Sequence, residues 1–210
     1  MGRLAEAANA AAAGLSVHAW LDRLAAATPA GADGLAAPAL CPRREDAAAR
    51  SACARHIDRP RLHHRLAHVW RAALEGVAFG FRHHVDVFRE RGADMRRIVA
   101  CDGGAASDLW LQICADVLDR PVQRLRRHPG SCLGAAYVAG VGVGVFKDWQ
   151  GGGRYVEPGE VFEPDRARVA VYDRAYAAFR ETYERLKTLY PALRFTAQKR
   201  FAPEARWAIA

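Results

Sequence analysis

The stretch that decides the fold runs over residues 96–118 and reads RRIVACDGGAASDLWLQICADVL. Its first six residues form a short apolar run, which is typical of a buried strand. Gly103 and Gly104 follow, and residues 108–118 carry apolar side chains at helical spacing. Ser107 stands where the N-cap of that helix is expected. The sequence therefore predicts a strand, a glycine turn and a helix in direct succession.

A turn of this kind is suited to ligand binding. Glycines let the backbone approach a ligand closely, and a helix N-terminus offers unpaired N–H groups with partial positive charge that suit a phosphate. The stretch matches neither G-x-G-x-x-G nor the phosphate loop that ends in Gly-Lys-Ser/Thr. On spacing alone, a glycine turn that binds nothing is equally acceptable.

Helical patterns surround this unit. Apolar residues recur at three- and four-residue steps from Leu66 to Phe88, which predicts a long helix with Gly92 as its C-cap glycine. Trp70, Phe81 and Trp110 are expected to be largely buried. Further helices are predicted over 1–27, 133–145 and 165–189, a second strand over 121–125, and an irregular crossing over 155–162. Because strands and helices alternate in the middle of the chain, the fold class is α/β.

Composition narrows the class of protein. The chain has 210 residues, of which 51% are hydrophobic, enough for a substantial core. No apolar run is long enough to span a bilayer, and the first residues do not form a signal peptide, so we expect a soluble cytoplasmic protein. The five cysteines include no C-x-x-C pair, which excludes a disulfide framework. Cys101 and Cys114 are expected to be small core residues.

The net charge of +8 raises the alternative of nucleic-acid binding. Residues 43–61 hold six arginines against three acids, but they include no aromatic residue that could stack on a base. The alternative reading is a basic helical binding module for nucleic acid or a protein partner, without catalysis. Such a module would bind polyanions in a salt-sensitive way.

Several runs resemble, in their order and spacing, the C-terminal domain of the FGGY family of carbohydrate kinases, and most closely its xylulokinase branch. These runs are LEGVAFGFR at 74–82, DGGAASDLW at 102–110, ADVLDRPV at 115–122, LGAA at 133–136 and FEPD at 162–165. The resemblance assigns residues 66–190 to the ATP-binding domain and 1–34 to its beginning. Residues 35–65 do not match, and 191–210 form a tail.

The resemblance implies an actin-like ATPase (ribonuclease H-like) domain, the C-terminal half of a two-domain sugar kinase with its active site between the domains. Such a kinase transfers the γ-phosphate of ATP to a hydroxyl of a sugar, here a pentulose like xylulose, with Mg²⁺ accompanying the nucleotide. The family's glycine turn lies against the nucleotide. The resemblance therefore implies that the ATP-binding residues are Gly103, Gly104, Ala105, Ser107 and Asp108.

The resemblance also implies that the N-terminal domain, with most of the sugar site and the catalytic base, lies outside this chain. Phosphoryl transfer depends on groups positioned on both sides of the cleft. We therefore expect no catalytic residue here, no activity by this portion alone, and a separately encoded N-terminal half as a partner. Asp116 is expected to be a surface charge and Glu75 a structural residue. The family often has a third glycine at the position of Asp102, although its glycerol kinase branch has aspartate there.

Residues 43–61 do not resemble the family, although their flanks do. Synonymous codons for this stretch, read in a frame shifted by one base, permit Gly-Glu-Lys-Thr-Pro-Leu-His-Asp-Pro-Leu-Ala-Arg-Gly-Thr-Ser-Ile-Gly-Leu-Gly, which is the family's pattern. Our hypothesis is that 43–61 is translated out of frame between two compensating shifts. We expect it to be exposed and poorly ordered.

The same region suggests a metal site. Cys53, His56, His63 and His68 carry side chains that bind zinc, but their spacing matches no familiar zinc pattern. The adjacent His83 and His84 point in different directions on a helix, so they do not form a ligand pair. From the sequence we expect no metal site.

Overall fold

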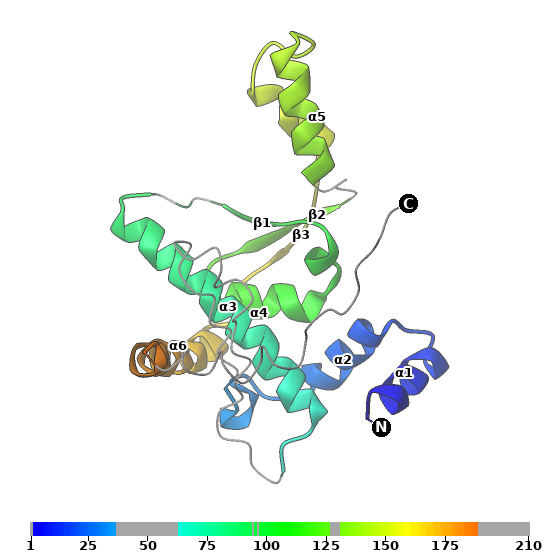
Figure 1. Cartoon of the computed structure of the whole chain (residues 1–210), viewed down its shortest axis with the longest axis vertical. Coiled ribbons are helices and arrows are strands. Elements are labelled where there is room, and N and C mark those ends of the chain that lie inside the picture. The colour runs from blue at the N-terminus through cyan, green and yellow to red at the C-terminus, as the bar shows by residue number, and fades with distance from the viewer. Residues whose placement is uncertain (1, 37–62, 94, 96, 127–130, 189–210) are drawn as a thin grey trace, which may run out of the picture.

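The strand, turn and helix expected within residues 96–118 are all present. The computed structural model describes residues 2–36, 63–93, 95, 97–126 and 131–188 (Figure 1). Strand β1 spans Ile98–Ala100, the 3-10 turn η3 spans Gly103–Ala106, and helix α4 spans Asp108–Leu118. This part of the sequence-based prediction is confirmed.

The described strands form one small mixed sheet in the order β1-β2-β3. Strand β2, Val122–Arg126, runs parallel to β1 and antiparallel to β3, Glu157–Phe162. The prediction of an irregular crossing over 155–162 is therefore wrong. Pro158 and Gly159 hide the strand pattern, but β3 lies at the edge of the described sheet, where a proline without an N–H is tolerated.

The first predicted helix is in fact two helices. Helix α1 spans Gly2–Ala12 and α2 spans Val17–Ala26. Gly14 turns the chain between them with a φ of 66°, and the Ser16 hydroxyl begins α2 by accepting a hydrogen bond from the Ala19 N–H at 3.1 Å. The alanine-rich sequence conceals this break, because alanine favours helix on both sides of the glycine.

The other helices follow the expected pattern more closely. Helix α3 spans Leu66–Glu90, and Gly92 ends it with a φ of 78° as the C-cap glycine. Helix α5 spans Ser131–Gly142 and α6 spans Arg166–Leu186, with two short 3-10 segments, η1 at Ala32–Gly34 and η4 at Gln150–Tyr155. None of the described helices is long and apolar enough to cross a membrane.

The main core lies where α3, α4 and α6 pack together beside the sheet (Figure 1). Phe79 on α3 packs against three aromatic rings of α6 at centroid distances of 5.6–6.1 Å. The largest fully buried apolar side chains are those of Leu111, Ile113, Val117, Val122 and Tyr172. This packing fixes α4, and therefore the glycine turn that precedes it.

Two expectations about burial are wrong, those for Phe81 and Cys101. Phe81 is 47% exposed, whereas Trp70 and Trp110 are half-buried. Phe81 lies two residues beyond the buried Phe79, about 200° further around the helix, so the two rings cannot share one face. Cys101 is exposed at the end of β1, whereas Cys114 is buried as expected.

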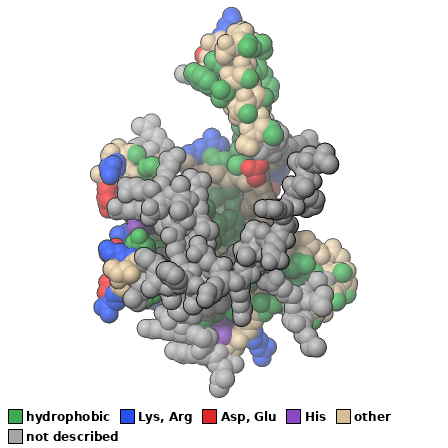
Figure 2. Space-filling view, in the orientation of Figure 1, with side chains coloured by type: hydrophobic (Ala, Val, Ile, Leu, Met, Phe, Trp, Pro, Cys, Tyr) green, Lys and Arg blue, Asp and Glu red, His purple; other side chains and the backbone are tan. Residues whose placement is uncertain are grey.

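Helix α5 and η4 form a unit that projects from the rest of the molecule, at the top of Figure 1, between β2 and β3. The Tyr137 ring stacks on Phe146 at 4.5 Å and lies 6.2 Å from the ring of Tyr155. Figure 2 shows hydrophobic side chains along this unit. Most of segment 35–65, including 43–61, lies outside the described residues, as does the tail from 189 onward.

Candidate functional site

The glycine turn η3 presents its backbone on an open side. Gly103 and Gly104 are exposed, whereas Ala105 is buried beneath them. A Cβ at Gly103 would meet nothing within 4 Å, and one at Gly104 would lie 3.4 Å from the Trp110 Nε1. The glycines therefore leave room above the turn and allow it to lie close to the Trp110 indole.

Asp102, directly before the turn, has an unusual backbone conformation. Its φ is 62° and its ψ is −155°, a region that essentially only glycine adopts without strain. Its carbonyl accepts a hydrogen bond from the Ala105 N–H at 3.0 Å, which closes the turn. The turn therefore holds Asp102 in a backbone conformation that is strained for a residue with a Cβ.

The two remaining candidate residues lie at the start of α4. The Ser107 hydroxyl accepts a hydrogen bond from the Trp110 N–H at 3.1 Å and so caps the helix, as predicted. The exposed Asp108 carboxylate pairs with the guanidinium of Arg124 on β2, and Arg124 also lies 3.4 Å from Glu160 on β3. The side chains of Ser107 and Asp108 thus have structural partners, and the backbone of Gly103 and Gly104 remains the open surface.

A cavity of about 510 Å³ borders this turn. Cys101 and Asp102 line it from the end of β1, and α5 and η4 line it from the other side. The further lining residues are Ser131, Leu133, Gly134, Tyr137, Val138, Trp149 and Gly152. A mostly apolar cavity with aromatic side chains and a few polar groups is typical of small-ligand sites.

The α5 side of the cavity was missed from the sequence. The Tyr137 hydroxyl donates a hydrogen bond to the Asp148 carbonyl at 2.9 Å, which joins α5 to the chain that leads into η4. Only the run at 133–136 pointed to this part of the chain. Half of the α5 residues are Ala or Gly and the others are mostly apolar on all sides of the helix, so the sequence gave no signal for which face lines a cavity.

The surroundings of Cys101 in the cavity wall disfavour its thiolate form. Partial desolvation of its thiol and, after that, the negative charge of the Asp102 carboxylate raise the pKa of Cys101. The thiol therefore stays protonated at neutral pH, and the thiolate is the reactive form.

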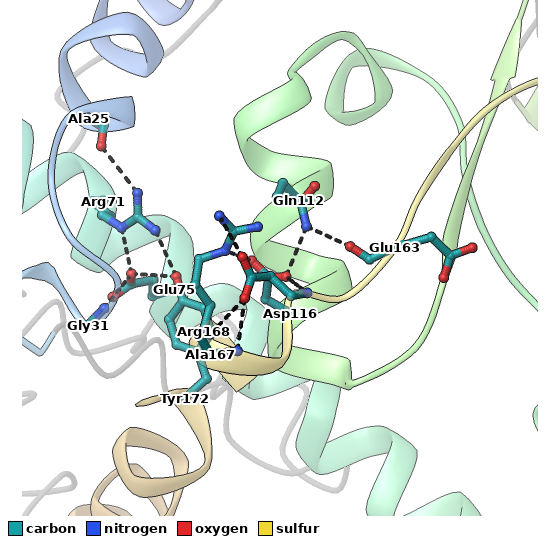
Figure 3. Close-up of polar contacts among 11 residues, drawn as sticks. Ala25, Gly31, Arg71, Glu75, Gln112, Asp116, Glu163, Ala167, Arg168 and Tyr172 are labelled. Atoms are coloured by element: carbon teal, nitrogen blue, oxygen red, sulfur yellow. Dashed lines mark hydrogen bonds and ion pairs between the residues drawn. The ribbon is translucent and has the colours of Figure 1, made fainter. Parts of the chain in front are cut away.

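Asp116 anchors α4 to the start of α6, and its prediction as a surface charge is wrong. It is 1% exposed, and its carboxylate accepts hydrogen bonds from Gln112 at 2.9 Å and from the Asp165 N–H at 2.8 Å (Figure 3). The Arg168 Nε lies 2.6 Å from its other oxygen. A buried carboxylate needs such partners, and two of them lie about 50 residues away in the sequence.

Glu75 occupies a second buried cluster, shown in Figure 3. One carboxylate oxygen accepts hydrogen bonds from Arg71 at 2.8 Å, from the Tyr172 hydroxyl at 2.8 Å and from the Gly31 N–H at 3.0 Å. Burial raises the pKa of Glu75, and the charge of Arg71 opposes that shift. These contacts join α3, α6 and the loop after α2, which gives Glu75 the structural role expected of it.

The comparisons with known proteins identify the family. A family model described as "FGGY family of carbohydrate kinases, C-terminal domain" matches residues 3–143. The chain therefore belongs to the FGGY family of carbohydrate kinases, which are ATP-dependent phosphotransferases, as the resemblance predicted.

Xylulose kinases are among the similar proteins. The xylulose kinase of Staphylococcus epidermidis is 32% identical over 127 residues, which cover 60% of this chain and 26% of that protein. That of Bacillus subtilis is 31% identical over 132 residues, 62% of this chain and 26% of that protein. The chain thus matches only about a quarter of the length of these relatives.

A solved structure agrees with these matches. The crystal structure of xylulose kinase from Rhodospirillum rubrum matches with 42% sequence identity and a TM-score of 0.71, over 83% of this chain and 35% of that chain. This likeness confirms the predicted α/β fold of the C-terminal half of a two-domain sugar kinase.

Proposed function

We propose that this chain is the nucleotide-binding part of an ATP-dependent carbohydrate kinase that phosphorylates a hydroxyl of a pentulose such as xylulose. The observation that carries the proposal is the exposed turn at Gly103 and Gly104, placed beside a cavity in a chain of this family. The turn follows the carboxyl end of β1, which is parallel to β2. In α/β folds, ligands bind outside the carboxyl ends of parallel strands.

The two parts of the site suit the two parts of ATP. The cavity beside Tyr137 and Trp149 offers apolar and aromatic surface to a planar base. The backbone of Gly103 and Gly104 leads into the N-terminus of α4, where N–H groups and partial positive charge favour phosphate oxygens. Trp110 lies directly behind Gly104 and keeps the turn in place.

Asp102 fits the Mg²⁺ that accompanies the nucleotide. Its exposed carboxylate lines the cavity next to the turn, and Mg²⁺ prefers oxygen ligands while keeping several waters. Asp108 is less suitable, because its carboxylate already pairs with Arg124. Mg²⁺ neutralises charge on the β- and γ-phosphates during transfer. The role of the chain is to orient the nucleotide to which Mg²⁺ is bound.

The sugar and the proton acceptor are expected from the rest of the kinase. None of the five candidate residues provides a free base, because the Ser107 hydroxyl caps α4 and the Asp108 carboxylate is paired. The match covers 26% of the length of the xylulose kinase relatives. We therefore expect sugar phosphorylation to require the remaining part of such an enzyme.

The alternative of a basic module for nucleic acid or a protein partner gains no support. Several arginines of the described residues are paired with carboxylates, among them Arg82 with Asp173 at 2.7 Å and Arg166 with Asp119 at 2.7 Å. The arginine-rich stretch 43–61 lies outside the described residues.

Isothermal titration of the whole chain with ADP and ATP, with and without Mg²⁺, tests the proposal. We expect weak binding by the wild type and its loss in Gly103→Val, whose side chain would enter open space above the turn. Gly104→Val should also lose binding, because its side chain would lie beside Trp110 and block close approach of a ligand to the backbone of the turn. Gly142→Val at the end of α5, also with nothing within 4 Å, is the matched control. Absence of binding by the folded wild type, or unchanged binding by Gly103→Val, would overturn the proposal.

A further inference from the structure

Three side chains that can bind a metal meet at the start of α3, in a place that the nucleotide site does not use. Asp33 comes from η1, and the adjacent His63 and His64 come from the turn before α3. One ligand atom from each lies within 4.8 Å of the other two. The His63 Nε2 is 2.6 Å from a carboxylate oxygen of Asp33, and both side chains are 51% exposed.

We propose that Asp33, His63 and His64 form a binding site for one divalent transition-metal ion of the zinc type. Imidazole nitrogen and carboxylate oxygen are ligands that zinc prefers, at bond lengths of about 2.0–2.2 Å. Tetrahedral geometry with such bonds separates neighbouring ligand atoms by about 3.3–3.5 Å. Rotations of these side chains would bring the three ligand atoms, now 2.6 Å to at most 4.8 Å apart, to this separation.

The short contact between Asp33 and His63 already brings two of the ligand atoms together. At 2.6 Å, the carboxylate oxygen and the His63 Nε2 share a proton in a hydrogen bond. On metal binding the ion takes the place of this proton, which a neutral ring carries on Nδ1 instead and a charged ring releases to solvent, so that both atoms become ligands. Two imidazoles in the set also select against Mg²⁺ and Ca²⁺, which prefer oxygen ligands alone.

The backbone places Asp33 in this position. Asp33 is in the left-handed region, with φ of 56° and ψ of 38°, between two residues of the same loop, Gly31 and Gly34, that also have positive φ. Ala32 and Leu35 on either side of it are buried against Ala72 of α3. The carboxylate is therefore presented from a loop that is packed against the helix.

Neighbouring groups define the extent of the site. The His64 Nε2 lies 3.3 Å from the Asp33 carbonyl, so His64 already faces η1. The His68 ring is 5.3 Å from the ring of His64, but the Nδ1 of His68 accepts a hydrogen bond from the Arg65 N–H at the start of α3. Among the described residues the set has three ligands, which leaves the fourth position of a tetrahedral site to water, as in open zinc sites.

A bound ion would join η1 to the start of α3 and so link two segments that lie 30 residues apart in the sequence. Because a ligand that binds only the folded state stabilises it, unfolding should become dependent on the metal concentration. This site and the nucleotide site share no residue. The spacing of cysteine and histidine in the sequence could not reveal the metal site, because Asp33 provides the third ligand.

Zinc titration of the chelator-treated chain tests the site, by calorimetry and by thermal unfolding. We expect one ion per chain and a rise of the melting temperature with zinc. Each of the variants Asp33→Asn and His63→Gln should lower the affinity at least tenfold. Both are conservative changes at exposed positions, and equal melting in chelator shows that they fold. His84→Ala, on the exposed part of α3, is the control that keeps wild-type affinity.

Replacing zinc with Co²⁺ allows a second measurement, because the visible absorption of bound Co²⁺ reports its coordination geometry. We expect a tetrahedral spectrum for the wild type and its loss in His63→Gln. If the wild type binds no zinc, or if Asp33→Asn and His63→Gln bind it as tightly as the wild type does, the site does not exist.

Discussion

The Nε atom of Arg71 lies 2.8 Å from the carboxylate of Glu75, one turn further along α3, and the two side chains are only 6% and 3% exposed. The Tyr172 hydroxyl also bonds this carboxylate from α6, and Arg71 in turn donates a hydrogen bond to the Ala25 carbonyl at 3.3 Å. Three separate segments of the chain thus depend on one buried ion pair. Removing either partner leaves the other charge buried without compensation.

Glu75→Ala should therefore destabilise the protein strongly. We expect a loss of about 3–5 kcal/mol in the free energy of unfolding, because the Arg71 guanidinium remains buried without its carboxylate. Glu90→Ala, at the exposed end of the same helix, should change stability by less than about 0.5 kcal/mol. Urea unfolding of both variants measures the difference. Equal losses would show that the buried pair does not hold the three segments together.

Glu75 should also make stability depend on pH. Its pKa is raised above the ordinary value of 4.5 in the folded state, mainly by burial, so the folded chain binds this proton more tightly than the unfolded chain. The part of its contribution that is linked to this proton is therefore fully present below pH 4.5 and is lost as the pH rises through the folded pKa, while the charge of Arg71 limits the size of that loss. Glu75→Gln should remove this slope. Unfolding of wild type and variant across this range measures it, and two parallel stability curves would contradict the assignment.

The central part of the fold was predictable from sequence because its signals are local. The long helix α3 follows from its apolar periodicity, its end from Gly92, and the start of α4 from Ser107. The failures concern partners distant in sequence. Asp116 is buried because Arg168 and the Asp165 N–H reach it from α6. Strand β3 exists because β2 provides its hydrogen-bonding partner.

The candidate nucleotide site was predictable in part for the same reason. Gly103 and Gly104 are recognisable because both local physics and the family resemblance point to the turn. The far wall of the cavity was not predictable from the sequence. Tyr137 and Trp149 reach the cavity only through the folding of the projecting unit that follows β2. The strain at Asp102 is a backbone property that no periodicity reveals.

Phe79 and Phe81 form a matched pair for testing the core. Phe79 is 6% exposed and packs on the rings of α6, whereas Phe81 is 47% exposed. We expect Phe79→Ala to cost about 3–5 kcal/mol, as for a buried aromatic ring. Phe81→Ala should cost only about 1–2 kcal/mol, because less apolar area returns to water. Thermal unfolding of the two variants compares them, and the reverse order would show that α3 presents another face to the core.

Asp102→Gly should stabilise the chain. A residue with a Cβ at this φ and ψ costs about 1–3 kcal/mol, and relief of that strain outweighs the added freedom of glycine in the unfolded chain, about 0.5–1 kcal/mol. Asp119→Gly is the control, since Asp119 has an ordinary left-handed conformation with φ of 48° that aspartate tolerates. Asp119→Gly should therefore raise the free energy of unfolding by less than Asp102→Gly does.

The same variant separates strain from metal binding. If the Asp102 carboxylate assists Mg²⁺, Asp102→Gly should weaken binding of Mg·ATP more than binding of metal-free ADP. Calorimetry with both ligands measures this. A stabilised variant with unchanged Mg·ATP affinity would support the strain at Asp102 and exclude its role in binding Mg²⁺.

The segment 43–61 allows a test of the frame-shift hypothesis. Its six arginines and three acids are costly to bury, yet Leu35, shortly before it, is part of the core beside α3. We expect a version with the frame-restored peptide to support sugar-dependent ATP turnover when the N-terminal part of a relative, such as the Rhodospirillum rubrum xylulose kinase, is supplied. The chain as given should support much less turnover under the same conditions, and a scrambled version of the restored peptide is the control. Equal turnover by the given and restored chains would show that 43–61 is functional as it stands, and codons across 35–65 that cannot encode the restored peptide would remove the hypothesis.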